Sequence, residues 1–171
     1  MENLQALRKW SELRGIAVVT LSDGKRIGSC DDFYFEPQTH SIYALYVKMG
    51  LLSHKVVLVA SITAVGQDAI TIPNEEALRR ESDDSRVAML LSGESLREYR
   101  VMSAGGTLVG TLGNVLLDTS TPNALRVGAF ELSGGLLNQL RGKYPTFAAS
   151  QVLTYGQDVL IIPDEVAQSL R

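Results

Sequence analysis

The sequence contains little of what most catalytic and metal-binding proteins depend on. Its 171 residues include one cysteine, Cys30, together with one tryptophan and two histidines. A single cysteine excludes an intramolecular disulfide and favours a reducing compartment. No apolar run approaches the ~20 residues of a membrane-spanning helix, and the acidic N-terminus does not resemble a signal peptide. These absences predict a cytoplasmic protein without a transmembrane segment.

An excess of positive charge is also lacking. Charged residues make up 20% of the chain, and the formal net charge is −3. A surface that follows the phosphates of a nucleic acid is normally basic, so this charge argues against nucleic acid as the partner. The hydrophobic fraction of 45% is that of an ordinary globular protein.

What the sequence does contain is an internal repeat. Residues 156–165 repeat the pattern of residues 66–75, in which Gly-Gln-Asp precedes an apolar run that ends in Pro. Two further matches pair residues 23–28 with 105–110 and residues 50–53 with 135–138. The matches keep their order while their separation grows, which indicates duplication with an insertion near residues 135–142. The predicted organisation is one unit over residues 1–80, a polar linker over 81–94 and a second unit over 95–171.

Short apolar or alternating segments, separated by Gly and Asp turns, predict six strands in each unit. The first unit has them at residues 16–21, 26–35, 42–49, 54–59, 61–65 and 69–72. The second unit has them at residues 99–103, 108–118, 125–132, 143–147, 152–155 and 159–162. A short helix is expected within residues 1–15 and after the last strand of each unit, where Asn74 and Asp164 are placed to cap it. The apolar run at residues 87–91 fits either an extra strand or a packing arm between the units.

Eight residues have the chemistry of tight turns or of close backbone approach. Glycine accepts positive φ, and the aspartate side chain bonds neighbouring backbone groups. These residues are Asp23, Gly24, Gly28, Gly66, Asp68, Gly110, Gly156 and Asp158. We expect Asp68 and Asp158 to cap their own turns.

Taken in order, these residues resemble the PRC-barrel domain, the small β-barrel of the photosynthetic reaction-centre H subunit and of ribosome maturation factors. The first unit carries the pattern at Asp23, Gly24, Ile27, Gly28, Asp32, Gly50, Gly66 and Asp68. The second unit departs from it, with Gly105 in place of Asp23 and Asn114 in place of Asp32. The resemblance implies an all-β fold of two tandem six-stranded barrels, each followed by a short helix. It also implies a docking or assembly role, and it implies no catalytic residue.

The residues that could carry chemistry do not form a recognisable constellation. His40 and His54 have no counterparts in the second unit, and two histidines with one cysteine lack the spacing of metal ligands. Asp31 and Asp32 are neighbours in a predicted strand, so we expect their side chains on opposite faces. The glycine-rich residues 105–113 lack the Lys-Ser/Thr ending of a phosphate loop. The sequence therefore predicts no catalytic residue, no cofactor and no metal site.

The remaining candidates are apolar residues at predicted surface positions. The candidate interface consists of Leu51, Leu52, Leu136, Leu137, Leu140 and Trp10. The leucines follow the third strand of either unit, where they can bind a partner or fold back over the end of their own barrel. The tryptophan can plug a barrel end or anchor an interface.

These observations predict a non-enzymatic protein-interaction or assembly module. Its partner would be another protein or a second copy of the chain, as in a homodimer. Two alternatives stay open. One is an RNA- or ribosome-associated maturation factor, and the other is a small-ligand binder that uses the groove between the barrels.

Overall fold

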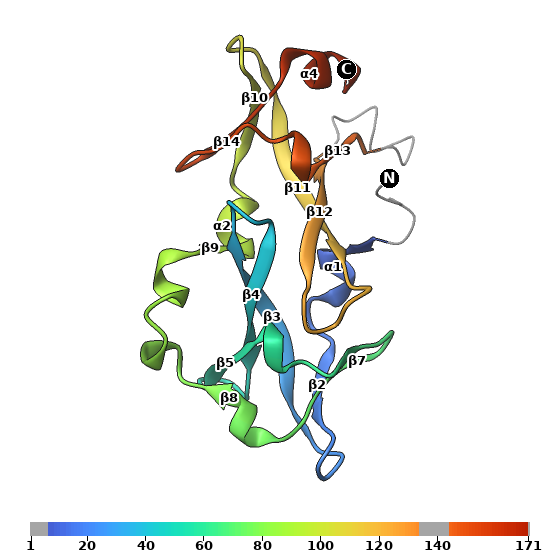
Figure 1. Ribbon diagram of the computed structural model, residues 1–171, viewed down its shortest axis with the longest axis vertical. Coiled ribbons are helices and arrows are strands. Elements are labelled where there is room, and N and C mark those ends of the chain that lie inside the picture. Colours follow the sequence, from blue (N-terminus) through green and yellow to red (C-terminus); the bar gives the residue numbers. More distant parts are fainter. Residues whose placement is uncertain (1–6, 134–143, 171) are drawn as a thin grey trace.

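The computed structural model describes residues 7–133 and 144–170. The molecule is elongated, with the strands of the first half at one end and those of the second half at the other (Figure 1). The α-helices of the described residues are short, namely α1 (Trp10–Leu13), α2 (Gly93–Leu96) and α4 (Asp164–Ser169). Within the described ranges, no helix is long and apolar enough to cross a membrane.

The first half is built of strands rich in apolar residues. They are β2 (Ala17–Thr20), β3 (Arg26–Glu36), β4 (Ser41–Lys48), β5 (His54–Leu58), β6 (Ala64–Val65) and β7 (Ala69–Ile72). In β2 and β7 every second residue is buried, so one face of each strand lies against the core. All six predicted strands of this half are present, with bounds that shift by a few residues.

The second half has strands at the corresponding places. They are β10 (Arg100–Ser103), β11 (Leu108–Asp118), β12 (Arg126–Leu132), β13 (Thr146–Ala148), β14 (Thr154–Tyr155) and β15 (Val159–Ile162). The predominantly β architecture agrees with the expected all-β class.

The two halves pair their strands in the same way. β2 is antiparallel to β3 and parallel to β7, just as β10 is antiparallel to β11 and parallel to β15. The pairing register of β3 shifts after Cys30 and again after Tyr34, and that of β11 shifts after Leu112 and Leu116. The short 3-10 helices η2 (Val59–Ser61) and η6 (Ala149–Gln151) precede β6 and β14. The halves therefore share one topology, including the position of its irregularities.

The strands do not, however, separate into two sheets. β12 pairs with β4 at Arg126 and Ser41, and the Ile42 N–H donates to the Leu125 carbonyl at 3.0 Å. The described strands form one continuous sheet whose order runs from β14 to β6 without closing. The prediction of two self-contained six-stranded units is wrong in this respect, because long-range pairing joins the halves at the centre.

Each half also pairs with a short strand that does not adjoin it in the chain. That strand lies just before the other half in the sequence. β1 (Arg8–Lys9) leads into the first half but pairs with β11 of the second. β9 (Leu91–Ser92) leads into the second half but pairs with β3 of the first. β9 and α2 lie within or next to residues 81–94, so the segment expected as a polar linker supplies structure to the first half. We call this arrangement the reciprocal exchange.

The helices that follow these strands continue the reciprocal exchange. At the start of α1, the Ser11 N–H donates to Asn114 Oδ1 at 3.3 Å. At the start of α2, the Glu94 N–H donates to Asp32 Oδ2 at 3.4 Å. Asp32 and Asn114 occupy matching positions in β3 and β11, so the same kind of contact is made twice.

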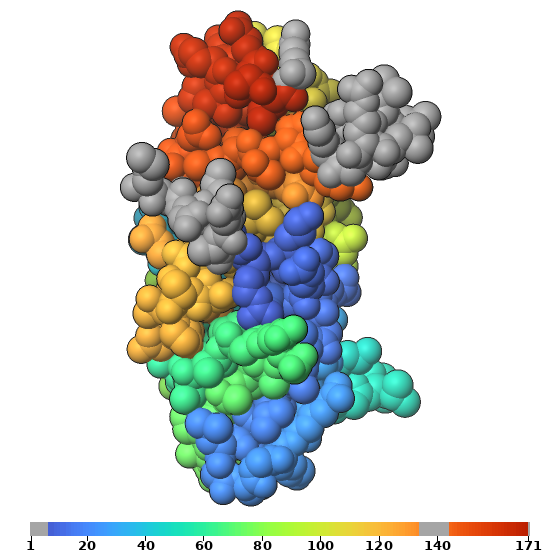
Figure 2. Space-filling model, turned by 90° about the vertical axis from the view of Figure 1, so that its right-hand side faces the viewer, coloured from blue at the N-terminus to red at the C-terminus, as the bar shows by residue number. Residues whose placement is uncertain are grey.

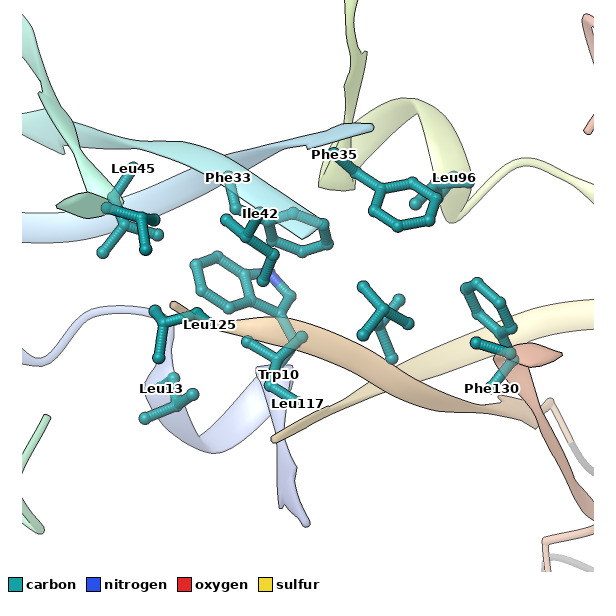
Figure 3. Close-up of a cluster of buried hydrophobic side chains, with 14 of the residues drawn as sticks. Trp10, Leu13, Phe33, Phe35, Ile42, Leu45, Leu96, Leu117, Leu125 and Phe130 are labelled. Atoms are coloured by element: carbon teal, nitrogen blue, oxygen red, sulfur yellow. The ribbon is translucent and has the colours of Figure 1, made fainter. Parts of the chain in front are cut away.

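The larger of two buried hydrophobic clusters among the described residues runs through both halves and includes Trp10 (Figure 3). The Trp10 side chain is 6% exposed and packs edge-to-face on Phe33, with 4.9 Å between the ring centroids. Figure 3 shows it between residues of the first half and Leu117 and Leu125 of the second. Trp10 therefore fills the seam between the halves. It does not cover the end of a barrel, and it is not available as a surface anchor.

The predicted tight turns close through backbone hydrogen bonds. Gly24 has φ +62 and donates to the Thr20 carbonyl at 2.9 Å, and the Asp23 carboxylate accepts a bond from the Thr20 hydroxyl. Gly66 and Gly156 close their turns by donating to the carbonyls of Ala69 and Val159, each at 2.8 Å. In the described part of the chain, Asp68 and Asp158 make no side-chain hydrogen bond. The predicted side-chain caps are not formed, because the backbone bonds already close these turns.

Both predicted helix caps also differ from the structure. Asn74 is followed by one 3-10 turn, η3 (Glu75–Ala77), and then by β8 (Leu78–Arg79), which pairs with β5. The helix predicted after the last strand of the first unit, which Asn74 would cap over residues 75–80, is wrong, because β5 pairs with part of this segment as a strand. The final helix α4 is present, but Asp164 does not cap it. Its carboxylate instead accepts a hydrogen bond from the Gly105 N–H at 2.9 Å.

Candidate functional site

The predicted leucine surface is found at the hairpin between β4 and β5. Leu51 and Leu52 are 93% and 98% exposed, so they do not fold back over the strands. Gly50 has φ +91 and lets the chain turn, and the Met49 N–H donates to the Ser53 carbonyl at 2.8 Å. Figure 2 shows this teal segment projecting from the body of the molecule. We call residues 49–53 the leucine tip. Leu136, Leu137 and Leu140 lie outside the described residues.

A second apolar surface was not predicted from the sequence. A groove of about 770 Å³ lies where the β3–β4 connection, the segment after residue 85 and β14 meet. Met89 on one wall is 85% exposed, and Leu153 near β14 is 59% exposed. We call it the seam groove, and define it by Glu36, His40, Met89, Leu90, Leu153 and Tyr155. The only sequence signal was the apolar run at residues 87–91. In this run Val87 is buried and Met89 is exposed. Periodicity in so short a run does not indicate which of its residues face the solvent.

The third feature is a polar cavity of about 420 Å³ beside the exchanged helices. Asp31 and Asp32 both line it, contrary to the expectation that they face opposite sides. The register shift after Cys30 is the cause, because a bulge interrupts the strict alternation of side chains. Asp32 accepts a hydrogen bond from the Phe33 N–H at 2.8 Å, and burial raises the pKa of its carboxyl. Asp31 pairs with Arg14 at 3.6 Å.

Other charged groups around this cavity hold the chain after β8 against the first half. Glu81, in η4 (Glu81–Asp83), accepts a hydrogen bond from the Tyr34 hydroxyl at 3.0 Å. It also pairs with His54 Nε2 at 3.2 Å. The His54 ring stacks on Tyr46, with 4.6 Å between centroids. Burial, followed by the bond to Glu81, raises the pKa of Tyr34. His54 therefore contributes to a structural contact.

A parallel set of contacts fixes the next stretch, η5 (Val87–Met89). The Tyr43 hydroxyl donates to Asp84 Oδ2 at 2.8 Å. The Arg86 guanidinium lies over the Tyr43 ring at 4.6 Å and pairs with Glu36. These bonds set the position of Met89 and so shape one wall of the seam groove.

The remaining candidates for chemistry lie apart from one another. His40 has φ +60 and stacks with Phe35 at 6.3 Å between centroids. Cys30 is buried, and burial, followed by the charges of Asp32 and Asp31, raises the pKa of its thiol. No group of three or more metal-binding side chains comes together in the described ranges. The glycine-rich residues 105–113 form the turn between β10 and β11 and the first part of β11.

Comparison with known proteins gives a match within the first half of the chain. A family model of the PRC-barrel domain matches residues 7–79, from the start of the described chain to the end of β8. The match does not extend to the second half. No curated protein matches the chain.

Proposed function

We propose that the chain is a non-catalytic protein-interaction or assembly module made of two PRC-barrel-type halves. Its partner is another protein or a second copy of the chain. The PRC-barrel domain at residues 7–79 supports this for the first half, and the shared strand pairings support its extension to the second. The engagement of Glu81 and His54 in structural contacts, and the enclosure of the Cys30 thiol, support a role without catalysis.

The observation that carries the proposal is the seam groove. Exposed apolar side chains that line one hollow, unlike single ones scattered over the surface, are typical of a site that a ligand or partner covers. Met89 and Leu153 come from distant parts of the chain and are brought to the same hollow by the tertiary fold. The groove is therefore built jointly by both halves, and its volume of about 770 Å³ suits one or more apolar side chains of a partner.

The leucine tip is less suited to form a protein interface on its own. It is convex, whereas a stable protein interface covers about 800 Å² on each partner, several times the surface of two leucines. We therefore assign the protein contact to the seam groove. The other leucines of the predicted interface lie outside the described residues and do not enter this assignment.

The experiment compares affinity capture by three forms of the full chain. These are the wild type, a groove variant with Met89→Ser and Leu153→Ser, and a control with Leu21→Ser and Leu108→Ser. The control leucines are 55% and 53% exposed and do not line the groove. Replacing them therefore removes two exposed apolar side chains, as the groove variant does, but leaves the groove intact. A specific partner is retained by the wild type and control and lost by the groove variant. Sedimentation velocity tests in the same way whether that partner is a second copy. Identical capture by all three forms would refute the groove assignment.

Two alternative functions give different results in simple titrations. An RNA-associated factor would bind single-stranded RNA at physiological salt more tightly than the 10⁻⁴ to 10⁻⁶ M that is typical of non-specific contacts, about 1 μM or below. A small-ligand binder would gain thermal stability from a ligand in the groove, and the groove variant would lose that gain.

A further inference from the structure

The leucine tip is a surface that the seam groove does not explain. Its two leucines are almost fully exposed and adjacent, and they are held at the end of a hairpin. The left-handed Gly50 and the bond from Met49 to Ser53 fix the backbone on either side of them. Figure 2 shows the segment standing away from the rest of the surface. A narrow projection of this shape can insert into a deformable or concave surface more readily than it can form a flat interface.

Basic residues line the hollow beside Leu51 and flank the leucine tip in β4 and β5. Arg26, Lys48 and Lys55 form no ion pair within the described part of the chain. Arg26 and Lys48 line the hollow beside Leu51, and none of the residues described around that hollow is acidic. By contrast, the nearby Lys25 is paired with Glu75 at 3.4 Å. In the described part of the chain, Arg26 and Lys48 therefore lie beside Leu51 without an ion pair, and Lys55 follows the tip in β5, although the net charge of the chain is −3.

We propose that the leucine tip binds the surface of an anionic lipid bilayer. Leu51 and Leu52 would enter the boundary between headgroups and acyl chains, while the three cations contact the headgroup phosphates. Peripheral membrane binding needs only a few inserted apolar side chains. The attraction of basic residues to anionic lipids adds to the affinity. The same two leucines are too few for a stable protein interface. Shape, hydrophobicity and charge therefore favour the bilayer over a protein as the occupant of this tip.

The magnitudes predict a reversible contact. Complete burial of a leucine favours binding by about tenfold or more, so partial insertion of two leucines should contribute at least about tenfold together. A Lys or Arg next to an anionic membrane contributes about fivefold. Because exposed charges are screened by salt, binding should weaken strongly between about 0.1 M and about 1 M salt.

The test is co-sedimentation of the purified full chain with vesicles. One set contains phosphatidylcholine with about 30% phosphatidylglycerol, and the other contains phosphatidylcholine alone. The wild type should bind the anionic vesicles and not the neutral ones. The variant with Leu51→Ser and Leu52→Ser should bind at least about tenfold more weakly, with an unchanged thermal midpoint because both side chains are exposed. The variant with Arg26→Gln, Lys48→Gln and Lys55→Gln should bind about a hundredfold more weakly.

Two controls make the outcome specific to the tip. The Leu21→Ser and Leu108→Ser control removes exposed leucines elsewhere, and the Met89→Ser and Leu153→Ser groove variant leaves the tip intact. Both should bind anionic vesicles as the wild type does, so a failure of the groove assignment would not affect this result. The proposal is overturned if the wild type does not bind anionic vesicles or if the tip variant binds as well as the wild type. Loss of a captured protein by the tip variant, without any vesicle binding, would instead identify the tip as a protein contact.

Discussion

Replacing Trp10 with alanine should destabilise both halves of the molecule at once. The side chain is 6% exposed, so the substitution removes almost the whole ring from the core. Replacement of a buried large aromatic residue by alanine typically lowers the free energy of unfolding by about 3–5 kcal/mol. The edge-to-face contact with Phe33 accounts for about 0.5–1.5 kcal/mol of this. For a chain of this length, the corresponding fall in the thermal midpoint is roughly 6–20 °C.

Because of the reciprocal exchange, we expect the loss of stability in Trp10→Ala to affect the unfolding of both halves. α1 leads into the first half but lies against β11 of the second, so both halves depend on the same seam. Urea unfolding should therefore remain a single transition, in the wild type and in the variant, with a similar dependence on urea. Far-UV circular dichroism is the suitable probe, because Trp10 is the only tryptophan and its fluorescence is lost on substitution.

Trp10→Phe is the matched control, since it keeps an aromatic ring at the seam and should recover more than half of the lost stability. A loss below about 1 kcal/mol for Trp10→Ala would contradict the burial of this side chain. Two separate unfolding transitions, with only one of them shifted, would show that the halves do not share a cooperative seam.

Three further substitutions test individual contacts. Gly28→Ala should lower the free energy of unfolding by about 1–3 kcal/mol, because the added Cβ would lie too close to the backbone oxygen of Lys48 in β4. Gly110→Ala should be neutral or raise it by up to about 1 kcal/mol, because the atom nearest to its added Cβ is 3.8 Å away. Equal thermal midpoints for these two variants would refute this reasoning. Burial raises the folded-state pKa of Asp32 above its unfolded value of about 3.9, so its contribution to stability is present at low pH and is lost as pH rises through the folded-state pKa. Asp32→Asn, which introduces the residue found at Asn114, should reduce that loss in urea midpoints measured from pH 4 to neutrality, about the range over which a raised carboxyl titrates. An unchanged pH dependence would show that Asp32 titrates normally. Cys30 is buried with a raised pKa, so a thiol reagent should label it only after unfolding, and rapid labelling of the native chain would contradict this.

Much of the secondary structure follows from local sequence. Strands were predicted at residues 26–35, 108–118 and 159–162 from alternation and from the turns beside them, and the structure has them at residues 26–36, 108–118 and 159–162. Turn glycines such as Gly24 were predicted for the same reason, since the requirement for positive φ acts on one residue at a time. The PRC-barrel resemblance was confirmed for the first half by the match at residues 7–79.

The errors fall where a distant segment competes with a local preference. Residues 75–80 have the composition of a short helix, but the free edge of β5 draws Leu78 and Arg79 into a strand. Asp164 is placed to cap a helix, but its carboxylate bonds the Gly105 N–H from another turn. Asp31 and Asp32 line one cavity because a bulge breaks the alternation of β3, which depends on the partner strand.

The sequence by itself determined the order of strands and turns and the likeness between the two halves, and it marked Leu51 and Leu52 as candidates for a surface whose exposure only the structure decided. The order and the likeness arise from propensity and periodicity within a few residues. Only the tertiary structure decided that the halves exchange their leading segments, that Trp10 is buried at their seam, and that Met89 and Leu153 face one groove. Each of these depends on the packing of segments far apart in the chain, and a pattern with a period of two residues does not specify which distant segment will cover a given face.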